Sequence, residues 1–262
     1  MIIKFITRII VFSLFMYLAF PLVVLIAVSF TDTNYLAFPP KGLTFRWYLS
    51  ILEDSSYTDS FQFSILLALV STLISVAIGI PASQVLARYQ FKGKSFVNHL
   101  IASPLLLPQI VFGIALLQFF YYFVDKPQSF WTLTIGHVVL TLPYIIKTCS
   151  ATFAGLPSSL EEAAADLGAN KWETFFLVKF PLIKPGVIAG GLFAFAISWI
   201  NVEVSIFLTA SNQMALPVKM FNYVQYNIDP TIAAVSAVTI YIAFLLIILI
   251  DHLIGIEKIA RN

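Results

Sequence analysis

Long apolar stretches separated by short polar segments dominate the chain. The apolar runs reach about 20 residues or more, the length that a helix needs to cross a hydrocarbon core about 30 Å thick. They do not show the alternating strands of about ten residues that are typical of an outer-membrane barrel. The pattern therefore predicts an all-α protein whose helices span a membrane.

The apolar stretches predict six transmembrane helices, at 9–30, 61–86, 99–124, 131–151, 183–208 and 229–250. The first stretch is too long for a signal peptide and lacks an A-x-A-like cleavage site, so we interpret it as an uncleaved span. An even number of spans places both termini on one side of the membrane. We expect a single transmembrane domain, residues 1–262, with a core at about 57–254.

Lys and Arg residues are unevenly divided between the two sides of these spans. Eleven lie on the side of the termini and four on the other, namely Lys41, Arg46, Lys126 and Lys219. Basic residues accumulate in cytoplasmic loops, so both termini are predicted to be cytoplasmic. The polar segment 152–182 then also lies in the cytoplasm, and the long loop 31–60 faces outward.

Composition supports this picture and narrows the function. Apolar residues make up 60% of the chain and charged residues 11%, and the mean hydropathy is +0.92, whereas about a quarter of the residues of soluble proteins are charged. The net charge of +2 is small and its basic residues are spread out, so nucleic acid is not an expected partner. The single cysteine, Cys149, has no metal-ligand spacing around it, and no metal site is expected.

The segment 152–182 is predicted to begin with a short helix. Ser158-x-x-Glu161 and Ser159-x-x-Glu162 are overlapping capping-box patterns, in which hydroxyl and carboxylate satisfy the first amides of a helix. Gly168 suits a left-handed helix end. An apolar stripe is expected along this helix at Leu160, Ala163, Ala164 and Leu167.

A second short helix is expected after the glycine. Asn170 and Glu173 repeat the capping pattern, and the helix should run to about Phe180, until Pro181 and Pro185 stop it. Two helices of about ten residues are too short to be stable alone in water, so they need a surface on which to pack.

Acidic residues on the first helix indicate what that surface is. Glu161, Glu162 and Asp166 are expected to form an exposed acidic face, and this helix has no Lys or Arg. An amphipathic hairpin resting on the bilayer is one alternative, but such helices usually carry basic residues toward anionic lipid. The charge pattern favours docking into a basic groove of another protein.

This segment resembles the EAA loop of ABC-importer permeases, whose pattern is E-A-A, three residues, G, nine residues and I-x-L-P. The matching positions are Glu162, Ala163, Ala164, Gly168 and Pro181, while Val178 and Phe180 stand where Ile and Leu are usual. The whole chain resembles the permease subunits of spermidine and putrescine importers, through RYQFKGK at 88–94, PLLLPQI at 104–110 and LPVKMFNYV at 216–224.

The resemblance implies a type I importer permease fold in a bacterial inner membrane and a set of partners. In this family the first helix of the loop sits in a groove of a cytoplasmic ATPase dimer, and ATP-driven closure of that dimer moves the permease. A second, homologous permease subunit and a periplasmic substrate-binding protein complete the importer, and lipid surrounds the spans. The expected ATPase-docking residues are Glu161, Glu162, Ala163, Ala164, Asp166, Gly168, Trp172 and Pro181.

The chain itself is not expected to be an enzyme. It has no Walker pattern, so ATP and magnesium would bind the partner ATPase and this chain would bind no cofactor. An intramembrane enzyme would need a set of convergent catalytic groups, and no HExxH, GxSxG or paired intramembrane aspartates occur. A secondary transporter or channel would explain the spans but not the acidic hairpin.

One carboxylate falls within the predicted fifth span. Burying Glu203 at the midplane of a bilayer would cost about 2.5 to 3.5 kcal/mol, and such residues usually face a water-filled path. Related polyamine permeases tend to have acidic residues where this chain has Ile200 and Asn201, so recognition of a cation would rest on Glu203. A merely hydrated or paired glutamate near the interface is the alternative.

Several further polar or aromatic residues are candidates for the substrate pathway, with ordinary helix packing as the alternative for each. Prolines near Gln109 could kink the third span and free carbonyls to line a cavity. The pathway candidates beside Glu203 are Asn201, Trp199, Gln109 and Tyr144, and Gln118 and His137 are further possible lining residues.

Small residues recur at four-residue intervals in two spans and predict close helix approach. The two sets are Gly186, Gly190, Ala194 and Ser198, and Ser75, Gly79 and Ser83. The substrate expected from the resemblance is spermidine, putrescine or a related small cationic or amino compound. Permeases of this group also carry phosphonate, opine, iron or thiamine, and these stay alternatives.

Overall fold

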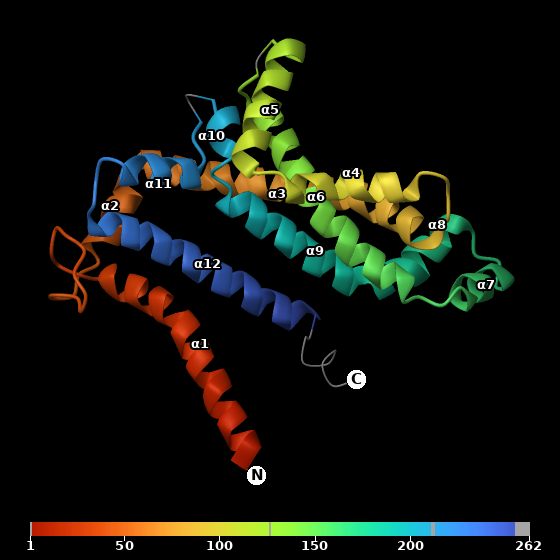
Figure 1. Ribbon diagram of the computed structural model, residues 1–262, viewed down its shortest axis with the longest axis horizontal. Coiled ribbons are helices and arrows are strands. Elements are labelled where there is room, and N and C mark those ends of the chain that lie inside the picture. The colour runs from red at the N-terminus through yellow and green to blue at the C-terminus, as the bar shows by residue number, and fades with distance from the viewer. Residues whose placement is uncertain (1, 126, 211–212, 255–262) are drawn as a thin grey trace. The chain divides into compact units, whose positions relative to one another are not determined.

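Every regular element among the described residues is a helix, which confirms the all-α prediction (Figure 1). The computed structural model describes residues 2–125, 127–210 and 213–254. Lys126, Lys258 and Arg261, which enter the charge count, lie outside them. The chain divides into two compact units, residues 60–219 and the flanking segments 1–59 with 220–262.

Four helices of the described chain are long and apolar enough to cross a membrane: Lys4–Val28, Ser55–Arg88, Phe130–Ala154 and Lys171–Ile200. A fifth is added if the bent pair described below counts as one span, and the apolar helix Pro230–Leu245 is shorter. The chain is therefore a polytopic membrane protein in composition and helix length. Six spans and cytoplasmic termini stay predictions.

The flanking unit contains α1 (Ile2–Val28), α2 (Arg46–Glu53), the start of α3 and α12 (Pro230–Ile254). The loop between α1 and α2 is fixed by side chains of α2. The Trp47 indole donates a hydrogen bond to the carbonyl of Thr31 (2.8 Å), and the Tyr48 hydroxyl lies 2.5 Å from that of Ser29. The loop that we predict to face outward thus has a defined conformation.

The central unit is built on α6 (Phe130–Ala154), which packs along α9 (Phe180–Ile200) (Figure 1). A Cβ added to Gly186 would lie 2.6 Å from the Thr152 side chain, and one on Gly190 would collide with Thr148 Oγ1. These glycines therefore permit the close approach of α9 to α6 that their spacing predicts.

The helix α3 (Ser55–Arg88) approaches α6 in the same way. A Cβ on Gly79 would lie 2.5 Å from Ile145 Cγ2, and the hydroxyls of Ser75 and Thr141 are 2.7 Å apart in the buried contact. The second set of small residues thus also marks a packed helix face, as predicted.

The third predicted span, 99–124, is not a continuous helix. It consists of α4 (Lys94–Leu106) and α5 (Gln109–Phe123), whose axes differ by 108°. Leu107 is extended, with ψ of 143°, because the Pro108 ring disfavours a helical conformation in the residue before it. The prediction of a kink is confirmed, but it is sharp enough to separate two helices.

The fifth predicted span, 183–208, is wrong at both ends. Its helix stops at Ile200, and the short α10 (Ser205–Leu208) follows after an interruption. Asn201 is extended (ψ 117°), and its side chain accepts a hydrogen bond from the Val204 amide (3.0 Å). A side chain that replaces a backbone acceptor in this way ends one helix and caps the next turn.

The start of this span differs for a second reason. Pro181 and Pro185 were expected to stop the preceding helix, but α8 (Lys171–Glu173), the π-helix η1 (Thr174–Lys179) and α9 form one continuous helix, Lys171–Ile200. The wide π turns pair the Phe180 amide with the Phe175 carbonyl, so Pro181, which has no amide hydrogen, follows without ending the helix.

Candidate functional site

The loop from Pro157 to Phe180 forms a helical hairpin, but its first helix lacks the predicted cap. In α7 (Ser159–Asp166), Ser158 has helical φ and ψ of −63° and −29° and makes no side-chain capping bond. A capping side chain needs an extended backbone at that position, so neither of the overlapping capping boxes forms. This expectation was wrong.

The end of α7 has the predicted left-handed glycine. Gly168 has φ of +85°, and the Ala169 amide bonds to the Ala164 carbonyl (3.0 Å) while the Gly168 amide bonds to Ala165 (2.9 Å). These two bonds define a Schellman motif. A Cβ on Gly168 would meet no atom of the described chain within 4 Å. The glycine is therefore required for its backbone conformation and not for close packing within this chain.

The second helix of the hairpin begins with the predicted capping box. Asn170 Oδ1 accepts from the amides of Trp172 and Glu173, each at 3.0 Å, and Glu173 Oε2 accepts from the Asn170 amide at 2.7 Å. The sequence pattern alone located this helix start.

Glu161 does not lie on the exposed acidic face where we expected it. Its carboxylate pairs with Lys179 Nζ at 2.6 Å and with Arg88 Nη2 at 3.5 Å. The Lys179 side chain is only 11% exposed and that of Glu161 35%. Because Arg88 ends α3 and Lys179 ends η1, Glu161 fastens α7 to two other helices of the unit.

The remaining loop residues present a mixed acidic and apolar surface, which we name the loop face. Only Ala164 of the predicted apolar stripe is buried, whereas Leu167 is 89% exposed. Trp172, itself 74% exposed, stacks on Phe176 with ring centroids 6.2 Å apart. The other exposed members of the loop face are Leu160, Glu162, Ala163, Asp166 and Leu177.

A cavity of about 820 Å³ separates the loop from α3. Its walls include Ala77 and Gln84 of α3, Glu161 of α7, and Phe175 and Lys179 of η1. The hairpin is thus held at its base by the Glu161 ion pairs while open space lies beside them.

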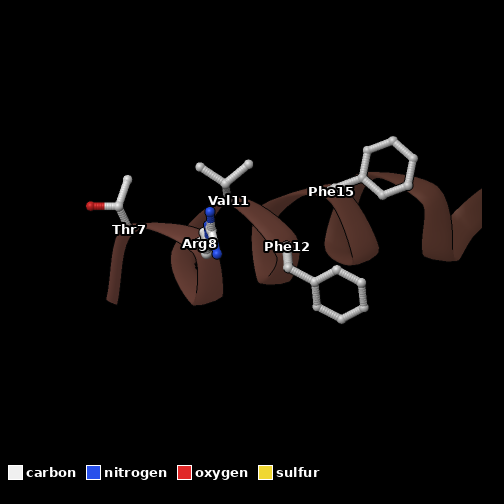
Figure 2. A pocket seen from close by; sticks show the side chains of 5 residues that line it. All are labelled: Thr7, Arg8, Val11, Phe12 and Phe15. Carbon is white, nitrogen blue, oxygen red and sulfur yellow. The ribbon is translucent and has the colours of Figure 1, made fainter. Parts of the chain in front are cut away.

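A second hollow, of about 370 Å³, lies on α1 and carries no sign of a ligand site. Figure 2 shows its five lining side chains, all from one exposed helix: Thr7, Arg8, Val11, Phe12 and Phe15. Apart from Arg8 and Thr7 they are apolar, as expected for a helix surface that faces lipid. A binding site would need several polar groups converging from different elements.

Two of the predicted pathway residues meet at the interruption of α9. Asn201 Nδ2 donates a hydrogen bond to Gln109 Oε1 at 2.6 Å, so the first residue of α5 is joined to the residue after α9. Asn201 is 3% exposed and Gln109 is exposed. The interruption between α4 and α5 and the interruption after α9 are therefore in direct contact.

Glu203 lies in this interruption and not inside a helix, which corrects the expectation from its apolar neighbours. Glu203 is exposed. Its backbone carbonyl oxygen would lie 2.9 Å from a Cβ built on Gly113 of α5. The glycine therefore lets α5 come into contact with the backbone of the interruption.

The other two pathway candidates lie along α9 and α6. Trp199 is buried and stacks on Phe195, with Phe61 edge-on to it at 5.3 Å. Tyr144 of α6 is half-buried and stacks on Phe193. Trp199 is close to the Asn201–Gln109 pair along the chain, but Tyr144 packs elsewhere against α9. Whether any of these residues lines a pathway stays a prediction.

Sequence reasoning missed most of a buried hydrogen-bond network around His137 of α6. This fully buried side chain contacts Ser198 Oγ through Nδ1 at 2.7 Å and Ser205 Oγ through Nε2 at 2.9 Å. Ser205 and Asn201 are linked in turn, because the Ser205 hydroxyl donates to the Asn201 carbonyl (2.7 Å). Ser198 had been noted only as a small residue, so its hydroxyl was not expected to bind histidine.

Comparison with known proteins identifies the family of the chain. Residues 75–255 match the family described as binding-protein-dependent transport system inner membrane component. The spermidine/putrescine transport system permease protein PotC of Escherichia coli (strain K12) is 29% identical over 250 residues, which cover 95% of this chain and 94% of that protein.

Other relatives carry different names. The putrescine transport system permease protein PotI of Escherichia coli (strain K12) is 29% identical over 85% of this chain and 81% of its own. The molybdate/tungstate transport system permease protein WtpB of Pyrococcus abyssi (strain GE5 / Orsay) is 30% identical over 70% of this chain and 68% of its own.

A solved structure supports the same fold at lower identity. A chain of a bacterial ABC transporter involved in the import of the acidic polysaccharide alginate superposes with a TM-score of 0.74 at 15% identity, over 96% of both chains. The family match covers most of this chain, the sequence relatives are permease proteins of transport systems, and the solved structure has the same fold. The protein therefore belongs to the family of binding-protein-dependent transport system inner membrane components.

Proposed function

We propose that the chain is a permease subunit of an ATP-driven importer in a bacterial inner membrane, and that the loop face is its contact with a cytoplasmic ATPase. A second permease subunit and a periplasmic binding protein complete the importer in this proposal. The names of the relatives, all of them transport system permease proteins, support the assignment.

The observation that carries the proposal is the exposure of the loop face. Glu162 and Asp166 lie four residues apart on α7 and are exposed, and Leu167 and Trp172 are exposed beside them. The exposed charges here are mainly acidic, with Lys171 beside Trp172 as a basic exception. An exposed surface that combines large apolar residues with an excess of one charge is typical of a protein interface. Its acidic charge fits a basic groove.

We propose a small cationic or amino substrate, such as spermidine or putrescine. The two polyamine relatives cover most of this chain. Glu203 is an exposed carboxylate at the interruption of α9, where the last carbonyls of a helix add negative potential. Both groups attract a cation, and discontinuous helices commonly form such sites in transporters.

An oxyanion substrate is the second candidate, because the molybdate/tungstate relative matches 70% of this chain. The charge at the interruption disfavours it, since Glu203 would repel an anion. Uptake assays with spermidine and with molybdate, using the importer reconstituted with its binding protein, separate the two candidates. Uptake of molybdate alone would replace the cationic proposal.

The ATPase contact is tested by Glu162→Lys. Reversing the charge of an exposed interface residue should abolish co-purification of the ATPase and lower ATP-driven uptake by about 100-fold, because a like charge facing a basic groove costs several kcal/mol. Glu162→Gln, which only removes the charge, should have an intermediate effect. Both variants should reach the membrane in normal amounts, as measured by immunoblot. Normal ATPase binding and uptake in Glu162→Lys would refute the assignment.

The substrate contact is tested by Glu203→Gln. Loss of one charge-assisted contact of about 1.4 kcal/mol should raise the half-saturating spermidine concentration about tenfold. ATPase co-purification should not change, because the loop face is untouched. Glu203→Asp keeps the charge and is the matched control. An unchanged half-saturating concentration in Glu203→Gln would show that this carboxylate does not contact the substrate.

A further inference from the structure

Two helix interruptions that are far apart in the sequence share one polar network, which is buried around His137 and reaches the exposed Gln109. The first lies at Leu107 and Pro108, between α4 and α5, and the second begins at Asn201, after α9. The 2.6 Å bond from Asn201 Nδ2 to Gln109 Oε1 joins them across 92 residues of sequence. Neither interruption is therefore an isolated defect of one helix.

His137 bridges the second interruption from the side. Ser198 lies in the last turn of α9 and Ser205 begins α10, so the two hydroxyls that contact the imidazole stand on opposite sides of the break. The ring belongs to α6, which is continuous at this point. It can therefore hold both halves of the broken helix against a third, unbroken helix.

The hydrogen-bond directions are consistent with a neutral imidazole. The Ser205 hydroxyl donates its hydrogen bond to the Asn201 carbonyl. Its oxygen therefore accepts the hydrogen bond from His137 Nε2–H. His137 Nδ1 then accepts from the Ser198 hydroxyl. Every polar atom in this chain of bonds has a partner, and Ser198, Ser205 and His137 are all buried. Removing one member would leave buried polar atoms unsatisfied, which is costly in a membrane protein.

Backbone packing around the break leaves little room for another arrangement. Cβ atoms built on Gly113 and Gly136 would lie 3.2 Å from Val204 Cα and 3.2 Å from Val204 Cγ1, respectively. The fully buried Val204 thus sits between α5 and α6. Exposure of residue 204 to solvent therefore measures any displacement of the interruption from α5 and α6.

We propose that His137 is a positioning residue that clamps the two sides of the α9 interruption, and that the Asn201–Gln109 bond makes both helix interruptions move as one unit. The clamp determines where Glu203 is presented. That last consequence rests on the proposed transport function, whereas the clamp itself does not.

The clamp is tested by the reactivity of a thiol introduced at the break by Val204→Cys, measured with N-ethylmaleimide on the full chain in membranes. The native Cys149 is the only other cysteine of the sequence and is fully buried in α6, so it serves as an internal control for general loosening. His137→Leu should raise the rate at the introduced thiol by about tenfold or more, because local opening becomes easier. The rate at Cys149 should not change.

Ser205→Ala provides a milder variant that removes one hydroxyl without changing the core volume much. It should raise the rate at the introduced thiol by a smaller factor of about threefold, because His137 keeps its bond to Ser198. An unchanged rate at the introduced thiol in both variants would overturn the clamp. Equal acceleration at both thiols would also overturn it, since His137 would then stabilise the whole unit and not the interruption.

The coupling of the two interruptions is tested with Gln109→Leu in the same background. If the interruptions move together, this change in α5 should also accelerate modification of the thiol introduced by Val204→Cys, by about threefold or more. A rate that responds to His137→Leu but not to Gln109→Leu would refute the coupling.

The functional consequence is tested in the reconstituted importer. His137→Gln should raise the half-saturating spermidine concentration several-fold while the maximal ATPase rate stays within about twofold, a split that general instability would not produce. A fall in the maximal ATPase rate as large as the rise in the half-saturating concentration would overturn the positioning role. A parent importer that takes up no spermidine would instead contradict the proposed substrate, and the thiol rates would still decide the clamp.

Discussion

The loop from Pro157 to Phe180 and the interruption after Ile200 are both polar breaks in an apolar chain, but they satisfy their polar groups in opposite ways. The loop leaves Glu162, Asp166 and an exposed Trp172 facing outward from this chain. The interruption buries Asn201 and links it to other helices through side-chain hydrogen bonds. The loop leaves charged and apolar side chains exposed, whereas the polar groups of Asn201, Ser198 and Ser205 are paired within the chain.

The difference shows how to interpret polar residues in an apolar protein. A buried polar group needs a hydrogen-bond partner, so a network that is fully paired indicates a fixed structure. An exposed surface with large apolar residues indicates a contact still to be made. Three pairs of variants can break or sharpen this comparison.

Gly113→Ala should have the largest effect on stability. Its Cβ would lie 2.7 Å from Phe207 and 2.9 Å from the Glu203 carbonyl, so the interruption would have to shift. Overpacking of this kind costs about 3 kcal/mol. The measurement is thermal unfolding of the purified protein in detergent. Gly191→Ala is the matched control, because within the described part of the chain a Cβ there would meet only Thr72 Cγ2, at 3.9 Å, apart from its own helix. Equal stability of the two variants would show that the interruption is not tightly packed.

Glu161→Gln and Glu162→Gln should separate the two kinds of polar residue within the loop itself. Glu161→Gln leaves the buried Lys179 without its charged partner and should cost about 2 kcal/mol of stability. Glu162→Gln removes an exposed charge and should leave the unfolding temperature unchanged while weakening ATPase binding. If both variants unfold at the parental temperature, the ion pairs do not hold the base of the loop.

Gly168→Ala should have the smallest effect, confined to the loop. A left-handed conformation costs an alanine about 1 kcal/mol more than a glycine. Hydrogen exchange of the amides of α7 should therefore become about fivefold faster. Gly155→Ala is the control, since Gly155 has φ of −80° and a Cβ there would make only ordinary contacts. Similar exchange in both variants would mean that the turn adapts without strain.

Local sequence patterns predicted two turns of the loop correctly, because each of these turns is determined by neighbouring residues. The left-handed Gly168 and the Asn170–Glu173 capping box both depend on atoms within five residues of each other. The errors in this region lie where the neighbouring residues did not determine the backbone conformation. Ser158 has the right neighbours but a helical backbone, and Pro181 follows a π-helix that the pattern of prolines could not reveal.

The interruption could not be predicted because its partners are distant in the sequence. His137 is 61 residues from Ser198 and 68 from Ser205. No local pattern relates such residues before the helices are placed side by side. One local signal was present: Asn201 is a strong helix-capping residue in an apolar run, and it could have predicted that a helix ends there.

The ion pairs of Glu161 could not be predicted from the sequence either, because their partners are also distant along the chain. Its neighbours indicated an exposed acidic face, and its position next to Glu162 gave no sign of a different role. Arg88 and Lys179, which it contacts, belong to other helices and lie 73 and 18 residues away from it in the sequence. Adjacent carboxylates on a helix point in different directions, and the fold decides which of them is paired.

The continuous helix Lys171–Ile200 connects the loop to the interruption as a single stiff element. Its 30 residues correspond to a rod about 45 Å long. The capping box at Asn170 lies at one end and the His137 network at the other. Because α6 packs along the α9 part of this rod from Gly186 to Ser198, the loop and the interruption stand at the two ends of one stiff element.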